Sequence, residues 1–249
     1  MLEEIYILWI RQLKRYVRSR SRMIGSLGQP LLFLVALWFG FGPIFQKAGG
    51  GNYLDFLAPG IIAMGILFTA MFMGIEVIWD RQFGFLKETL VAPVSRLTIV
   101  VGRTLGGATV AFAQGIVVLL ITLVVGFRPL NPSMIPLALL FMFLVGMLFT
   151  AMGTAIASVM EDMHAFPLIM NFLLMPMFFL SGALFPIENL PPSIGFIARI
   201  DPLSYGVDGL RGTLASSTLF GLGTDLAVLV GAIIIIFTLS AVAFSKIEV

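Results

Sequence analysis

Six stretches of the sequence, each at least 20 residues long, contain no lysine, arginine, aspartate or glutamate. They cover residues 23–46, 56–75, 104–127, 129–160, 163–187 and 226–245. About 20 apolar residues in a helix are enough to cross the roughly 30 Å hydrocarbon core of a bilayer. Only 11% of the residues are charged, compared with about 25% in a typical soluble domain. The sequence therefore predicts an all-α integral membrane protein with six transmembrane helices.

The whole chain forms one transmembrane domain, residues 1–249, in this interpretation. We place its spans at residues 23–46, 56–79, 98–127, 133–160, 163–185 and 223–245. An even number of spans puts both termini on one side of the membrane. Eleven of the basic residues fall on that side and four on the other, so the positive-inside rule makes both termini cytoplasmic.

The first 22 residues predict an amphipathic helix, with apolar side chains on one face and basic ones on the other. Such a helix lies in the cytoplasmic interface, held by aromatic rings and attracted to anionic lipid. The expected membrane anchors are Trp9, Arg11, Lys14, Arg15 and Arg18. The alternative is an ordinary basic flank that only sets the topology.

Residues 80–94 form a charged but still amphipathic segment between two apolar stretches. Phe83, Leu86 and Leu90 recur at spacings of three and four, which places them on one stripe of a helix. Arg81 and Glu88 fall on nearly the opposite side. An apolar ridge of this kind inserts into a groove of a soluble partner or rests on lipid, and the spacing alone leaves both readings open.

Residues 186–214 are too apolar for a free loop and too interrupted to span the membrane. Pro191-Pro192 and Asp201-Pro202 predict two helix starts, with Asp201 as the N-cap and Pro202 at the first helical position. We expect two short helices that dip into the outer leaflet or lie on it.

Small residues recur at intervals of four in the third and fourth spans. These are Gly102 and Gly106, followed by Gly146, Thr150 and Thr154. Small side chains let transmembrane helices approach closely, and packing within the chain is a better explanation than the wall of a pathway. The charge-free stretches contain neutral polar groups such as Gln29, Gln114 and Asn171, and an interhelical hydrogen bond is the expected role of each.

The sequence lacks the groups that several kinds of chemistry require. It contains no cysteine and one histidine, which excludes thiolate metal sites and leaves no histidine pair for a metal. None of the four lysines precedes Ser or Thr, so no P-loop for ATP can form. A net charge of +2 gives no reason to expect nucleic acid. Glu161 and Asp162, just before His164, are read as a solvated turn, and the alternative for them is a metal site. A membrane-embedded enzyme that acts on lipid is a separate alternative for the whole chain, for which His164 beside Glu161 is a weak signal.

Residues 80–94 resemble the cytoplasmic motif of the ABC-2 family, the permeases of certain ATP-binding-cassette transporters, and most closely its branch of daunorubicin-type drug-resistance exporters. Asp80, Arg81, Gly84, Leu86, Glu88, Leu90 and Pro93 occupy the motif positions. The acidic residue is displaced by one position, because Lys87 intervenes. A second block, residues 179–191 with 201–211, is similar to the family's region before the last span.

This resemblance implies a coupling helix at residues 80–94 that docks on a separate nucleotide-binding subunit. The coupling residues would be Arg81, Phe83, Gly84, Leu86, Glu88, Leu90 and Pro93. It also implies re-entrant helices before the last span and an assembly of two permease chains, expected to be a homodimer, with two ATPase subunits. ATP and Mg would bind the partner, and this chain would bind no cofactor or metal.

The activity that the resemblance implies is export of a hydrophobic drug, a lipid or a lipid-linked glycan. The expected location is the plasma (inner) membrane of a prokaryote, as a multi-pass protein. The alternative is a membrane partner of an ATPase that assembles or signals without transport.

Overall fold

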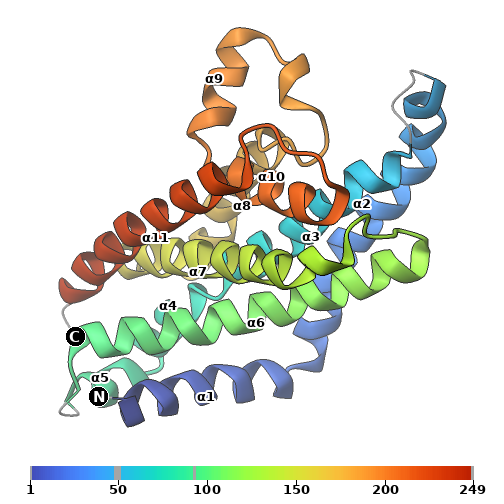
Figure 1. The fold of residues 1–249 in the computed structure, drawn as a ribbon. Coiled ribbons are helices and arrows are strands. Elements are labelled where there is room, and N and C mark those ends of the chain that lie inside the picture. The colour runs from blue at the N-terminus through green and yellow to red at the C-terminus, as the bar shows by residue number, and fades with distance from the viewer. Residues whose placement is uncertain (1, 48–51, 92–93, 248–249) are drawn as a thin grey trace.

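The computed structural model describes residues 2–47, 52–91 and 94–247, and the regular structure in these ranges is entirely helical. Eleven α-helices and two short 3-10 helices follow one another along these ranges, so the expected all-α class is confirmed (Figure 1). They are α1 (Leu2–Arg18), α2 (Arg20–Lys47), α3 (Tyr53–Phe72), α4 (Ile75–Gln82), α5 (Phe85–Val91), α6 (Arg96–Val125), η1 (Pro132–Met134), α7 (Ile135–Val159), α8 (Ala165–Leu180), η2 (Ile187–Asn189), α9 (Pro192–Ile200), α10 (Pro202–Ala215) and α11 (Leu222–Ser245).

Five helical segments of the described chain are long and apolar enough to cross a membrane: α2, α3 together with α4, α6, η1 together with α7, and α11. The remaining expected span, residues 163–185, contains α8, which has only 16 residues. At 1.5 Å per residue it is about 24 Å long, shorter than the hydrocarbon core. It ends at Leu180 because Gly182 adopts a φ of +76° that turns the chain. A sixth crossing therefore stays a prediction.

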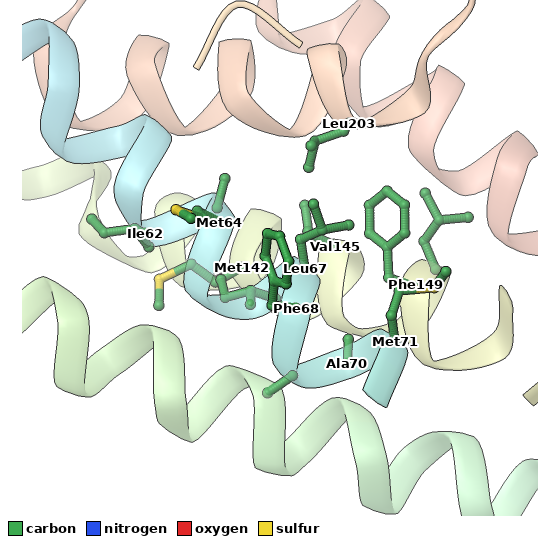
Figure 2. Packing of buried hydrophobic residues seen from close by; sticks show 14 of the residues in the cluster. Ile62, Met64, Leu67, Phe68, Ala70, Met71, Met142, Val145, Phe149 and Leu203 are labelled. Carbon is green, nitrogen blue, oxygen red and sulfur yellow. The ribbon is translucent and has the colours of Figure 1, made fainter. Parts of the chain in front are cut away.

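Helix α3 is the centre of the molecule. Most of its length is buried, whereas α2 and α11 are largely uncovered. Figure 2 shows side chains of α3, α7 and α10 meeting in this core, among them Ile62, Met64, Leu67, Met142, Val145, Phe149 and Leu203. These side chains are buried because α2, α6, α7 and α10 pack around α3. The outer helices keep apolar faces that lipid or another chain can cover.

The helical bundle has two ends, which we call the α5 end and the α9 end, and they differ in their polar contacts. At the α5 end, Arg81 forms an ion pair with Glu161 of the α7–α8 turn, and Arg96 donates to the carbonyl oxygen of Ile247. Both termini lie at this end (Figure 1). At the α9 end, the Tyr53 hydroxyl donates to the carbonyl oxygen of Leu184 at 3.4 Å. The α6–α7 loop meets α10 there as well.

The short helices before α11 begin where the prolines predicted. Helix α9 begins at Pro192 and α10 at Pro202, and the Asp201 carboxylate caps α10 by accepting the Leu203 amide at 2.9 Å. Both helix starts and the N-cap are confirmed. Helix α10 packs against α3, α7 and α11, while α9 projects from the bundle (Figure 1).

The prediction of one continuous helix over residues 80–94 is wrong. Helix α4 ends at Gln82 and α5 begins at Phe85. Gly84 lies between them with a φ of +81°, a conformation that glycine adopts far more readily than other residues. Because the helix is interrupted there, Phe83 and Leu86 do not share one stripe. Pro93, one of the expected coupling residues, lies outside the described residues.

Candidate functional site

Two carboxylates of α4 are buried at the α5 end. Glu76 and Asp80 are four residues apart, which places them on the same face of the helix. Their exposed fractions are 0% and 1%. Burying an ionised carboxylate is costly unless it is paired and hydrogen-bonded, so each of these side chains needs cationic partners.

Four arginines from three helices supply those partners. Asp80 accepts from Arg11 at 3.1 Å, from Arg15 at 3.2 Å and from the buried Arg103. Glu76 accepts from Arg22 at 2.8 Å, and its second oxygen lies 3.6 Å from Arg15. We call these six residues the ion-pair network: Arg11 and Arg15 of α1, Arg22 of α2, Glu76 and Asp80 of α4, and Arg103 of α6. Four positive and two negative charges leave it with a formal excess of +2.

Helix α1 runs along the first half of α6 rather than resting on lipid alone. A Cβ atom added to Gly102 would lie 2.7 Å from Leu8 Cβ, and one added to Gly106 would lie 2.6 Å from Gln12 Cβ. The two glycines therefore let α1 approach α6. Farther along, the Tyr16 hydroxyl donates to Gln114 Oε1 at 3.1 Å, the interhelical hydrogen bond expected of that glutamine.

The expected membrane anchors separate into two groups. Trp9 donates its indole N–H to Thr109 of α6 at 3.0 Å, and the guanidinium groups of Arg11 and Arg15 bind Asp80. Their polar groups therefore hold α1 on the protein. Lys14 and Arg18 are exposed, and these two remain available to lipid.

The apolar side chains around α5 are divided between core and surface. Leu86 is completely buried, whereas Phe83 and Phe85 are 69% and 49% exposed. The Arg11 guanidinium lies 5.7 Å from the centre of the Phe85 ring, which is within cation–π range. Glu88 is exposed on α5, and Leu90 belongs to the same helix. The surface that a partner can touch thus contains the two phenylalanines and not Leu86.

Arg81 connects this surface to the α7–α8 turn. Its guanidinium lies 3.1 Å from Glu161, and the Gln82 amide donates to the Glu161 carbonyl oxygen at 3.1 Å. In the same turn, the His164 amide donates to Asp162 Oδ1 at 2.7 Å. These acidic side chains support the turn. Among the residues that the structure describes, no group of three or more His, Asp or Glu side chains is placed to hold a metal.

The remaining small residues lie at contacts within the chain. A Cβ atom on Gly146 of α7 would lie 3.1 Å from the carbonyl oxygen of Ala108 in α6. Thr150 faces Gly107 of α6, and Thr154 is buried one turn later. The close crossing of α6 and α7 accounts for their small size.

The sequence pattern did not reveal the ion-pair network. Arg22 and Arg103 are two of the eleven basic residues that the positive-inside rule counts on the cytoplasmic side, and Glu76 lies within the span expected at residues 56–79. One signal was present: two carboxylates spaced four apart at the end of a predicted span share a helix face and need cations. Which arginines would reach them depends on how α1 and α6 pack, and this is a property of the fold.

Comparison with known proteins relates most of the chain to one family. The family described as ABC-2 type transporter matches residues 3–215. The transport permease ycf38 of Pyropia yezoensis is 30% identical over 221 residues, which cover 85% of this chain and 74% of that protein. Nodulation protein J of Rhizobium leguminosarum bv. viciae is 27% identical over 222 residues, covering 88% of this chain and 85% of that protein.

Proposed function

Since the chain belongs to the ABC-2 type transporter family, we propose that it is the membrane-spanning permease subunit of an ATP-driven exporter. Membership of this family implies an ATP-binding partner subunit. The energy for transport would then come from the partner, which would bind ATP and Mg. The similarity to two groups of proteins, one of them named transport permease, supports transport over a role in assembly or signalling alone.

The docking surface that we propose for the ATPase subunit is the exposed pair Phe83, in the link between α4 and α5, and Phe85, the first residue of α5. This single observation carries the proposal: two large aromatic side chains are exposed beside a basic helix, at an end otherwise rich in ion pairs. Exposed aromatic residues next to arginine are typical of interface hot spots. A partner segment with an apolar side chain and a carboxylate would suit the α1–α5 surface.

The ion-pair network would transmit a movement of the docked α5 to the helices of the membrane domain. Helix α5 follows α4 after the short Phe83-Gly84 link, and α4 is bound to α1, α2 and α6 through Glu76 and Asp80. A displacement of α5 would therefore move four helices together. Separating the partners of a buried ion pair is strongly destabilising. The four helices would therefore move as a unit.

We further propose an assembly of two permease chains, expected to be identical, with two ATPase subunits in the inner membrane of a prokaryote. Both termini and α5 would face the cytoplasm, and residues 186–214 would form the re-entrant segment on the outer side. A hydrophobic drug, a lipid or a lipid-linked glycan would be the cargo. The large uncovered apolar surfaces of α2 and α11 support contact with a second chain or with lipid.

Copurification from native membranes tests the docking surface. Wild-type protein should bring down an ATPase subunit with a P-loop, and Phe83→Asp should reduce its recovery at least about tenfold, as expected for loss of a hot-spot side chain of 2 kcal/mol or so. The bound fraction is then assayed for ATP hydrolysis.

Val159→Asp is the matched control, because Val159 is also apolar, 71% exposed and located at the α5 end, on α7. This variant should keep the ATPase. If Phe83→Asp brings down as much ATPase subunit as the wild type does, docking at α5 is contradicted. A wild-type protein that is folded but brings down no ATPase would contradict the transporter function itself.

A further inference from the structure

A cavity of about 360 Å³ lies where α1, α2 and α3 meet, next to the ion-pair network. Its wall consists of the last turns of α1 and α3 and the first turns of α2. The lining residues on which the argument depends are Tyr16, Arg22, Gly25, Pro30, Phe68 and Phe72. Ser26, Gln29 and Thr69 complete the lining, so the cavity has one charged side chain, three neutral polar ones and a wall whose exposed surface is mainly apolar.

Arg22 at this cavity has donor capacity that its protein partners do not use fully. One terminal nitrogen binds Glu76 at 2.8 Å, but the other is 3.1 Å from the sulfur of Met73. A thioether is a weak acceptor. The network around Arg22 also has an excess of two positive charges, so an added anion would improve its balance of charge.

The opposite part of the cavity is suited to hydrocarbon. Pro30, Phe68 and Phe72 supply apolar surface, and Gly25 leaves one side open because no atom outside its own helix lies within 4 Å of the position of a Cβ. Helix α2 is largely uncovered along its length. A molecule in the surrounding bilayer can thus reach the cavity sideways.

We propose that this cavity binds the headgroup and the first chain segments of an anionic phospholipid from the cytoplasmic leaflet. The phosphate would bind the Arg22 nitrogen that now contacts only the Met73 sulfur, because guanidinium groups form strong charge-assisted hydrogen bonds with phosphate. The acyl chain would lie along Phe68 and Phe72. The inference uses the orientation given under Proposed function but not the contact with an ATPase, so the two are tested separately.

Native mass spectrometry of the purified full chain, with phosphatidylglycerol or phosphatidylcholine added, measures the affinity of single bound lipids. Phosphatidylglycerol should bind roughly tenfold more tightly, as expected when one or two basic residues attract a net anionic lipid. Gly25→Leu fills the cavity and should abolish this preference. Arg22→Gln should reduce it as well, while Arg22→Lys retains part of it.

Gly28→Leu is the matched control, since Gly28 lies on the same helix with equally open surroundings but does not line the cavity. It should bind phosphatidylglycerol like the wild type. Equal affinities for the two lipids would overturn the proposal, as would equal effects of the two leucine variants. Displacement of the lipid by millimolar glycerol 3-phosphate would identify a site for free phosphate and would also overturn it.

Discussion

Asp80 is the residue on which the attachment of α1 depends most directly, because it accepts hydrogen bonds from Arg11, Arg15 and Arg103. Replacing it with asparagine keeps the shape but removes the charge that balances the buried Arg103. Breaking a buried pair in this way costs about 3–5 kcal/mol. We therefore predict that Asp80→Asn loses stability of that order, measured by reversible unfolding in mixed micelles.

Glu161→Gln serves as the comparison for Asp80→Asn, because its pair with Arg81 is exposed to solvent. Exposed pairs contribute about 0–1 kcal/mol, so this variant should unfold close to the wild type. Similar small losses in both variants would show that the network does not hold α1 in place.

The buried carboxyl of Asp201 should make the stability of the protein depend on pH. Its contribution can be separated from those of other titratable groups by substitution. Burial raises the pKa of its carboxyl from 3.8 to about 7, although the Leu203 amide partly opposes this. Because the folded pKa lies above the unfolded value, folding favours the protonated form. The corresponding stability is fully present below about pH 4 and is lost as the pH rises through about 7. At about 1.4 kcal/mol per tenfold change in proton affinity, the loss is at most roughly 4 kcal/mol.

The measurement for Asp201 is the thermal unfolding midpoint in detergent at pH values between 5 and 8. We expect the wild-type midpoint to fall relative to that of Asp201→Asn, whose amide oxygen can still cap α10 without titrating. Parallel curves for the two proteins would refute the assignment of the pH dependence to this residue.

At the scale of the elements, α1 is fixed to α6 through two glycines, and this predicts a specific sensitivity to side-chain size. The chain has no cysteine, so Gln12→Cys introduces a single thiol at a buried position. In the wild-type background it should react slowly with a maleimide. Adding Gly106→Leu displaces α1, because even a Cβ atom there lies 2.6 Å from Gln12 Cβ, and the rate should rise at least about tenfold. Gly28→Leu, in open surroundings, should leave the rate unchanged.

Local signals explain which elements could be predicted from sequence. The long helices follow from charge-free length, and α9 and α10 follow from their prolines and from the Asp201 cap. The break at Gly84 was missed because glycine is also tolerated inside a helix. The partners of Gly102 and Gly106, the burial of Leu86 and the arginines around Asp80 depend on which faces meet. A single sequence without the packed structure does not specify those contacts.

At the scale of the whole molecule, the two ends differ in chemistry. The α5 end holds the ion-pair network, both termini and most of the basic residues, whereas the α9 end carries α9 and the loops that meet α10. Basic residues flanking membrane helices are retained in the cytoplasm. This asymmetry predicts that the α5 end faces the cytoplasm.

The orientation can be measured with single thiols, because every introduced cysteine is unique in this chain. Lys87 on α5 and Ser193 on α9 are both exposed and lie outside the ion-pair network. In intact cells, an impermeant maleimide should label Ser193→Cys, while Lys87→Cys should react only after the membrane is permeabilised. Labelling of Lys87→Cys in intact cells would show that the α5 end faces the outside, opposite to the proposed orientation. The proposed ATPase could then not reach α5, and the cavity at Arg22 would face the outer leaflet, so this one result would remove the premise of both proposals.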